Sequence, residues 1–438
     1  MSIDLKRSTS KIATSLGLLS QLPRSLDQCK KTTHIPINFQ KVDCTLLRGD
    51  NLDALALLSG LNNPFVDFCY IDPPYNTKNK FIYNDTRTGN SSEVFGSHSE
   101  WMTFMLPRLV AAHSVINETG FIAVSIDDHE QPYLRLLLDK IFGEENFAGN
   151  IVVCRSKNGK GSNKGIAVNH DYVVVYSKSH QAEIIGLGDD ETKYDQQDIH
   201  GRYKVDGLFR KKGDASKRED RPNMFYPLYY DELGRVFTKK SHSNQKEVYP
   251  VDSKGIERRW LWGRDKAELE SWKLYASKNG VIYVKNYSSH DKKIKIRSFW
   301  DNNKYLTERA TSQIKDIYGE KIFETPKPVE LIEDLILSLS SKDSVILDFF
   351  AGTGTTAHAA HNLNLTDGGS RKVILVEQDI NISDAHVAFS YGYRTIADIT
   401  EARLQYISKE QNSYSYESIS LDDLNATNDQ KNVSLAYG

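Results

Sequence analysis

The residues best suited to chemistry are Asp72-Pro73-Pro74-Tyr75, which directly follow the apolar run 66–71. That run predicts a buried strand, so the tetrapeptide would stand where a strand ends. Asp72 would supply a carboxylate, and Pro73 a backbone carbonyl that two successive prolines hold in place. Tyr75 would offer a ring face for an unstacked base, worth about 1–3 kcal/mol. The set could therefore grip a flat aromatic amine by its edge and its face.

The exocyclic amine of adenine is such a group, and it is a poor nucleophile because its lone pair is delocalised into the ring. Two acceptors that bind both amine hydrogens favour a pyramidal nitrogen and stabilise the positive charge that develops as it attacks a methyl group. We expect Asp72 and the carbonyl of Pro73 to be these acceptors, without a metal ion. The alternative is an ordinary Asp-Pro turn beside a packed tyrosine.

A second chemical segment is the glycine turn 348–356, with the sequence Asp-Phe-Phe-Ala-Gly-Thr-Gly-Thr-Thr. A strand, a glycine turn and a helix in this order bind nucleotide-like cofactors at the helix N-terminus. Glu377 lies 23 positions after Gly354, near the roughly 20 expected for a carboxylate that binds ribose. The turn also fits a dinucleotide fingerprint, or a packing role alone, but the two phenylalanines favour a sulfonium cofactor over a pyrophosphate.

Predicted strands and helices alternate on either side of an irregular middle, which implies a mainly parallel sheet covered on both faces. The expected strands are 45–47, 66–71, 120–126, 151–153, 172–176, 344–347 and 373–376, and the expected helices are 52–58, 101–116, 134–142, 330–339 and 357–363. The same patterns divide the chain into an N-terminal arm (1–35), a catalytic half-core (36–180), an insertion (181–320), a cofactor half-core (321–408) and a polar tail without order (409–438).

Length and composition narrow the class of protein. A chain of 438 residues is too long for one compact core, and no apolar run approaches the roughly 20 residues of a membrane span. The first 31 residues lack the sustained apolar stretch of a secretory signal. Four widely spaced cysteines favour reduced thiols in a cytoplasmic protein without zinc: Cys29, Cys44, Cys69 and Cys154.

Basic residues concentrate in the middle of the chain. Residues 201–300 carry 24 Lys and Arg against 13 Asp and Glu, although the whole chain has a net charge of −2, and they hold four of the five tryptophans. A basic, aromatic-rich segment indicates a polyanionic partner, but a solvated basic face over a small core is about equally favoured by composition alone. The candidate phosphate contacts are Arg210, Lys211, Lys212, Arg258 and Arg259.

Two further features have competing interpretations. The run Asp127-Asp128-His129-Glu130 resembles a metal cluster, but consecutive side chains point in different directions, so we favour caps of the helix that follows. Lys327 stands between two prolines before a predicted helix. It could contact a cofactor or a substrate, or it could lie on the surface of a rigid turn.

At these residues the chain resembles S-adenosylmethionine-dependent DNA amino-methyltransferases of the circularly permuted beta group, and above all the modification subunits of type III restriction systems. The resemblance covers roughly residues 40–180 and 322–405. The order of catalytic motif, insertion and cofactor motif is typical of that group. The segments that carry the resemblance are 49–51, 72–77, 81–85, 125–128, 325–328 and the glycine turn.

The resemblance implies a circularly permuted, Rossmann-like α/β fold with a mostly parallel twisted sheet and an inserted target-recognition domain. It implies S-adenosylmethionine as cofactor, with its methionine end against Asp348, Phe350, Gly352, Gly354 and Thr355, its ribose against Glu377 and its adenine against Asp50. The expected cofactor set also includes Asp72, Lys327, Phe349 and Thr356. Asp72, Pro73, Pro74 and Tyr75 would hold a flipped base, and aspartate rather than serine at position 72 favours adenine N6 over cytosine N4.

The expected function is therefore a sequence-specific DNA adenine-N6 methyltransferase, part of a restriction-modification or solitary system. Its expected partners are double-stranded DNA, a second copy in a homodimer and a restriction subunit, without a membrane. The chain is short for a type III modification subunit, so a solitary or type II-like methylase is also open. The competing functions are a cytosine-N4 methyltransferase, an enzyme acting on RNA, a non-catalytic DNA-recognition subunit and a dinucleotide oxidoreductase.

Overall fold

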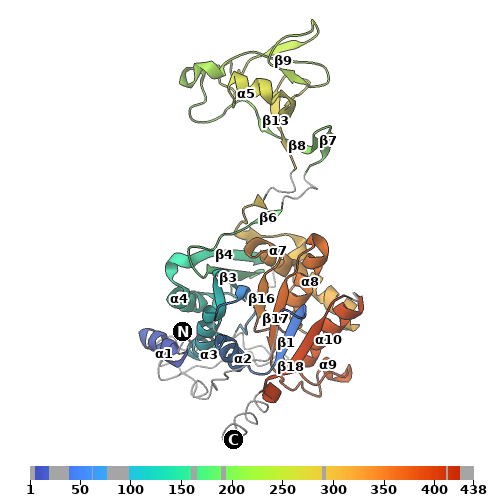
Figure 1. Cartoon of the computed structure of the whole chain (residues 1–438). Coiled ribbons are helices and arrows are strands. Elements are labelled where there is room, and N and C mark those ends of the chain that lie inside the picture. Colours follow the sequence, from blue (N-terminus) through green and yellow to red (C-terminus); the bar gives the residue numbers. More distant parts are fainter. Residues whose placement is uncertain are drawn as a thin grey trace, which may run out of the picture. The chain divides into compact units, whose positions relative to one another are not determined.

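The computed structural model describes residues 5–18, 39–61, 63–75, 98–158, 165–188, 194–288, 293–410 and 413–424. Residues 76–77 and 81–85, which contribute to the resemblance, lie outside these ranges. The chain divides into two compact units, Met1–Leu187 with Lys295–Gly438, and Gly188–Ile294 (Figure 1). The second unit begins and ends inside the expected 181–320 insertion, and the segment 295–320 belongs to the first unit.

A large sheet forms the centre of the first unit. Nine strands in the described part of the chain lie in the order β15-β4-β5-β3-β2-β16-β17-β1-β18. Most neighbours are parallel, while β5 runs antiparallel to β3 and β4. The expected, mainly parallel α/β sheet is confirmed; its circular permutation stays a prediction. The strands are β1 (Cys44–Arg48), β2 (Val66–Ile71), β3 (Ile116–Ile126), β4 (Phe147–Cys154), β5 (His170–Ser177), β15 (Phe299–Trp300), β16 (Val345–Asp348), β17 (Lys372–Glu377) and β18 (Tyr416–Ser420).

Helices cover both faces of this sheet (Figure 1). One face packs against α1 (Leu5–Ser15), α2 (Asn51–Ser59), α3 (Ser99–Val115) and α4 (Gln131–Phe142), and the other against α7 (Val329–Leu339), α8 (Thr355–Asp367) and α10 (Ile396–Glu410). Two smaller contributions are α6 (Thr307–Tyr318) and α9 (Val387–Ser390), which share a satellite cluster with α10. None of the described helices has the length and apolar character of a membrane span.

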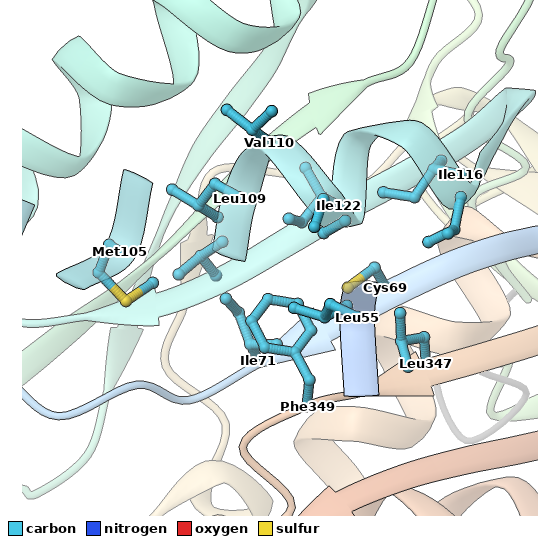
Figure 2. Close-up of a cluster of buried hydrophobic side chains, with 14 of the residues drawn as sticks. Leu55, Cys69, Ile71, Met105, Leu109, Val110, Ile116, Ile122, Leu347 and Phe349 are labelled. Atoms are coloured by element: carbon cyan, nitrogen blue, oxygen red, sulfur yellow. The ribbon is translucent and has the colours of Figure 1, made fainter. Parts of the chain in front are cut away.

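Alternate residues of each strand enter opposite layers of the core. In β2, Cys69 and Ile71 pack toward α2 and α3, whereas Phe68 and Tyr70 pack on the other face. Figure 2 shows the first of these layers, in which side chains of α2, α3, β2, β3 and β16 meet. Burial on both faces explains why the strands read as continuous apolar runs. Three cysteines in these described segments are free and buried, namely Cys44, Cys69 and Cys154, and Cys29 lies outside them.

The C-terminal segment differs from the expected polar tail without order. β18 pairs in parallel with β1, and Tyr414 and Leu421 on either side of it are buried. A strand at this position covers the backbone groups that β1 would otherwise present at the edge of the sheet. The segment was misjudged because a half-exposed edge strand carries few apolar residues. Residues 425–438 lie outside the described ranges.

The second unit is rich in short strands. Its four-stranded sheet has the order β12-β13-β8-β7 and its three-stranded sheet the order β10-β9-β11, while β6 and β14 form a two-stranded pair. Phe209 and Trp260 stack at the centre of its apolar core. The elements are β6 (Leu187–Gly188), β7 (Gln196–Asp198), β8 (Gly201–Leu208), β9 (Leu228–Tyr230), β10 (Val236–Phe237), β11 (Lys246–Val248), α5 (Arg264–Leu269), β12 (Leu274–Ala276), β13 (Ile282–Tyr287) and β14 (Lys293–Ile294).

The packing of the C-terminal segment can be tested by substitution. Leu421 is 6% exposed and joins the core beneath α2, so Leu421→Ala should lower the free energy of unfolding by roughly 2–5 kcal/mol. Ser418→Ala, at an exposed position of β18, should change it by less than about 0.5 kcal/mol. Urea denaturation measures both. Equal, small effects would show that this segment does not belong to the fold.

Candidate functional site

The direction of chain progression through the sheet reverses between β2 and β16. From β2 the chain continues through α3 to β3 on one side, and from β16 through α8 to β17 on the other. Because α3 and α8 cover opposite faces of the sheet, the loops that leave β2 and β16 diverge and open a crevice at the carboxyl ends of these strands. The register pairs Phe68 with Ile346 and Cys69 with Leu347, which brings Asp72 beside the glycine turn.

A cavity of about 370 Å³ lies at this point, and both chemical segments line it. Asp72 and Pro74 come from the loop after β2, and the glycine turn contributes Asp348, Phe349, Phe350, Gly352, Thr355 and Thr356. Lys327 precedes α7, and Glu377 ends β17. The two segments, nearly three hundred positions apart, therefore open onto one cavity.

Two carboxyl groups of this cavity, the buried Asp348 and the half-buried Glu377, accept hydrogen bonds from the chain around them. Asp348 accepts from the backbone N–H of Phe350 at 3.1 Å and from the hydroxyl of Thr356 at 2.6 Å. Glu377 accepts from the backbone N–H of Gly352 at 2.6 Å. Burial raises the pKa of Asp348 to about 7 and the pKa of Glu377 to about 8, and nearby carboxylates add to both shifts. A cationic ligand would favour the ionised form of both groups.

The glycine turn needs its glycines for their backbone conformation. Gly352 has φ of +54° and Gly354 has φ of +75°, which is the left-handed region that other residues rarely adopt. Gly352 faces the cavity, and the hydroxyl of Thr400 donates to its carbonyl at 2.6 Å. Gly354 is the N-cap of α8 and is absent from the described cavity lining. Of the two glycines, only Gly352 thus borders the cavity.

Asp50, expected to contact the adenine of a cofactor, is also absent from the described cavity lining. It caps α2 by accepting from the backbone N–H of Leu52 at 2.8 Å, and it accepts from Arg108 at 3.3 Å. Gln378, which does line the cavity, donates to Asp50 at 2.8 Å. The carboxylate of Asp50 therefore caps α2 and contacts the cavity only through Gln378.

A second cavity, of about 300 Å³, shares a wall with the first. Asp72, Thr325, Pro326 and Lys327 line both cavities. The other lining residues of the second cavity include Pro73, Tyr75, Arg155, Asp171, Tyr172 and Tyr305. The expected catalytic tetrapeptide thus spans the boundary, because Pro74 faces the first cavity while Pro73 and Tyr75 face the second.

The tetrapeptide is held by contacts with distant segments. The ammonium of Lys327 donates to both carboxylate oxygens of Asp72 at 2.7 Å and to the hydroxyl of Tyr75 at 2.8 Å. Tyr75 donates to Asp72 at 2.6 Å, and the indole of Trp101 donates to the carbonyl of Pro74 at 2.7 Å. Burial, followed by the carboxylate of Asp72, raises the pKa of Tyr75 well above its usual value. Tyr75 is therefore a neutral hydrogen-bond donor.

The acidic run 127–130 has a different role from the expected helix caps. Glu130 is fully buried and contacts Nδ1 of His98 at 2.7 Å, and as N-cap of α4 its side chain makes no capping bond. The carboxylate of Asp127 instead accepts a hydrogen bond from the backbone N–H of His129, two residues along the chain, at 2.9 Å. Within the ranges that the structure describes, no group of three or more His, Cys, Asp or Glu side chains could hold a metal ion.

The basic residues predicted to contact phosphates fall into two sets. Arg259 is 8% exposed and donates to the carbonyl of Ala215, and Arg258 forms an ion pair with Asp252 at 2.9 Å. The side chains of Arg210, Lys211 and Lys212 form no hydrogen bond or ion pair with another described residue. Three of the five candidates are thus available to an external anion, whereas Arg258 and Arg259 support the second unit.

Sequence patterns missed several lining residues. Asn51, Phe323 and Gln378 line the first cavity, and Arg155, Asp171 and Tyr305 line the second. The available signal was a polar residue beside an apolar run: Asn51 begins an apolar helix, and the half-buried Asp171 lies near the start of the apolar strand β5. Phe323 and Tyr305 come from segments without periodicity, where no sequence signal distinguishes a lining residue from a packed one.

Comparisons with known proteins agree with these motifs. A family described as DNA methylase matches residues 66–417. The Type II methyltransferase M.KpnI of Klebsiella pneumoniae is 51% identical, over 94% of this chain and 98% of that protein. The Mod subunit of the Type III restriction-modification enzyme EcoPI of Escherichia phage P1 is 34% identical, over 91% of this chain and 67% of that subunit. The solved PvuII DNA methyltransferase (cytosine-N4-specific) is 13% identical, covers 86% of this chain and 95% of its own, and has a TM-score of 0.42.

The buried carboxyl of Asp348 predicts a pH-dependent stability. Its pKa is about 7 in the folded chain and near 4 when unfolded, so between these values the folded state binds the extra proton and stability falls as pH rises. Asp348→Asn removes this loss. From pH 5 to pH 8 the native chain should therefore lose roughly 2–3 kcal/mol of unfolding free energy relative to the variant.

Urea denaturation of both proteins at the two pH values measures the difference. The control is Asp252→Asn. A hydrogen bond from the backbone N–H of Ile256, together with one from the side chain of Arg258, lowers the pKa of Asp252. Asp252 therefore stays ionised from pH 5 to pH 8, and its contribution to the free energy of unfolding should be constant over this range. A native-to-Asp348→Asn difference that stays constant with pH would contradict the assignment of a proton-binding carboxyl to Asp348.

Proposed function

This chain belongs to the DNA methylase family, and from that premise we propose that it transfers a methyl group from S-adenosylmethionine to N6 of a flipped adenine in double-stranded DNA. The observation that carries the proposal is the position of Asp72 in the wall between two cavities. A cofactor in one cavity and a base in the other would meet at this carboxylate. The remaining features concern how each ligand is held.

The chemistry of the first cavity fits a cationic cofactor. Its described lining contains the carboxyl groups of Asp72, Asp348 and Glu377 and one cation, Lys327. Carboxyl groups that outnumber the cations around a cavity suit a ligand that carries positive charge, and they disfavour a pyrophosphate. S-adenosylmethionine supplies an activated methyl group on a positively charged sulfur. Asp348, Phe350, Gly352 and Thr355 would hold its methionine end, and Glu377 its ribose.

In the second cavity the chain would hold and activate the target base. The carboxylate of Asp72 and the carbonyl of Pro73 accept the two amine hydrogens, which directs the nitrogen lone pair toward the first cavity and stabilises the developing positive charge. Tyr75 offers its ring face to the base. Unstacking the adenine costs a few kcal/mol, which DNA contacts elsewhere must offset. The reaction then depends on alignment across the shared wall.

Two choices within this proposal rest on specific features. The aspartate at position 72 favours adenine N6, and cytosine N4 is the alternative outcome of the test below. The chain is 51% identical to the type II relative and 34% identical to the type III subunit, so we favour a type II-like or solitary enzyme. A homodimer, a restriction-subunit partner and a cytoplasmic location stay predictions.

We further propose that the second unit recognises the DNA target.

The function is tested by methyl incorporation. The native chain, incubated with tritiated S-adenosylmethionine and genomic DNA from a methyltransferase-deficient bacterium, should label the DNA, and digestion to nucleosides should place the label in the N6-methylated form of deoxyadenosine. Asp72→Ala should lower the rate by roughly 100- to 1000-fold, while calorimetry shows cofactor binding close to native.

The control for this variant is Asp43→Ala. Asp43 forms a comparable half-buried ion pair with Lys372 at 3.0 Å, but at the amino ends of β1 and β17, opposite the cavities. It should keep near-native turnover. Label in N4-methylcytosine would overturn the choice of base, and an unlabelled product with the native chain would overturn the function itself.

DNA binding should depend on the available basic residues of the second unit. Each phosphate contact contributes about 0.9 to the slope of log affinity against log salt, so Lys211→Ala and Lys212→Ala should each reduce that slope by about 1. Fluorescence anisotropy with a genomic DNA fragment at several KCl concentrations measures it. Arg259→Ala should instead lower the melting temperature, because Arg259 is buried. Unchanged slopes in both lysine variants would exclude them as phosphate contacts.

A further inference from the structure

Lys327 occupies a central place in the wall that the two cavities share. It lies in the turn before α7, between Pro326 and Pro328, and lines both cavities. Its side chain is 15% exposed, and that of Asp72 is 24% exposed. The two flanking prolines restrict the backbone of the turn, and this limits the positions that the ammonium of Lys327 can take.

The hydrogen bonds of Lys327 hold both side chains that are expected to bind the target base, Asp72 and Tyr75. Its ammonium contacts Oδ1 and Oδ2 of Asp72 at 2.7 Å each and the hydroxyl of Tyr75 at 2.8 Å. Tyr75 closes the triangle by donating to Oδ1 of Asp72 at 2.6 Å. The ammonium also lies 5.0 Å from the centre of the Tyr75 ring. One cation thus orients the carboxylate that would accept the amine and the ring on which the base would lie.

The surroundings of Asp72 require a cation at this place. Asp72 adds to the raised pKa of Asp348 on one side and of Asp171 on the other. Burial is the main cause of the raised pKa of Asp171, and Lys327 followed by Arg155 opposes it. Neighbouring carboxylates that share a site cannot all stay ionised without compensation. Lys327 supplies that compensation where Asp72 and Tyr75 meet.

We propose that Lys327 is a positioning residue for methyl transfer, which holds the carboxylate of Asp72 and the ring of Tyr75 in the arrangement that accepts the target base. This inference rests on the proposed function. In the described contacts, Oδ1 of Asp72 receives Lys327 and Tyr75, whereas Oδ2 receives Lys327. A carboxylate oxygen has two lone pairs, so Oδ2 keeps acceptor capacity and is the oxygen assigned to the amine hydrogen.

The test combines substitution with chemical rescue. Lys327→Ala should lower the initial rate of tritium transfer to unmethylated genomic DNA by roughly 100-fold. The dissociation constant of S-adenosylmethionine, measured by calorimetry, should stay close to native because Asp348 and Glu377 remain. Added ethylammonium, which can fill the vacated site and donate N–H bonds, should restore part of the rate in a saturable manner. Tetramethylammonium at the same ionic strength has no N–H and should not.

The control is Lys372→Ala, which breaks a half-buried ion pair of similar exposure with Asp43 away from both cavities. It should keep near-native turnover and show no response to ethylammonium. If Lys327→Ala does not fold, as judged by its melting curve, Lys327→Met keeps the apolar stem and should show the same loss of rate with intact cofactor binding.

Each contrary result has a defined meaning. Near-native turnover of the Lys327 variants would overturn the inference. So would a loss of rate that ethylammonium does not restore, or that tetramethylammonium restores equally, since Lys327 would then serve structure alone. If the native chain itself transfers no label, the proposed function fails first, which distinguishes the two failures.

Discussion

Parallel pairing between β2 and β16 is the constraint on which the rest of the site depends. It places two loops side by side that are separated by most of the chain. From β2 the chain proceeds to one side of the sheet and from β16 to the other, so the two loops diverge and leave the crevice open. The core on both faces secures the pairing, because Cys69 and Leu347 pack in one layer and Phe68 and Ile346 in the other. A change of register by one residue would exchange these layers and turn Asp72 away from its present neighbours.

Much of this arrangement could be predicted from the sequence, because buried parallel strands carry a strong apolar signal and glycine turns have distinctive residues. Asp72, Asp348 and Glu377 all stand at ends of such strands and line one cavity as expected. What could not be predicted depends on contacts between distant side chains. The hydrogen bonds from Lys327 to Asp72 and Tyr75 join residues that are 255 and 252 positions apart in the chain. Local sequence patterns carry no information about such contacts.

The second unit shows why composition alone was ambiguous. The basic window 201–300 has 24 Lys and Arg against 13 Asp and Glu, but the compact unit 188–294 has 23 against 18, because the boundaries exclude two basic residues and include an acidic stretch. Arg258 and Arg259 are further committed to Asp252 and Ala215. Arg258 and Arg259 thus stabilise the second unit, whereas a polyanionic partner for its other cations stays a prediction.

The wall formed by Asp72, Thr325, Pro326 and Lys327 has a consequence for how the two cavities behave together. Because the same four residues border both, an occupant of one cavity that shifts them also changes the shape and charge met by an occupant of the other. Thermodynamic reciprocity then demands that each ligand alter the affinity of its counterpart by the same factor. Any such coupling would act through the layer of side chains that the two cavities share.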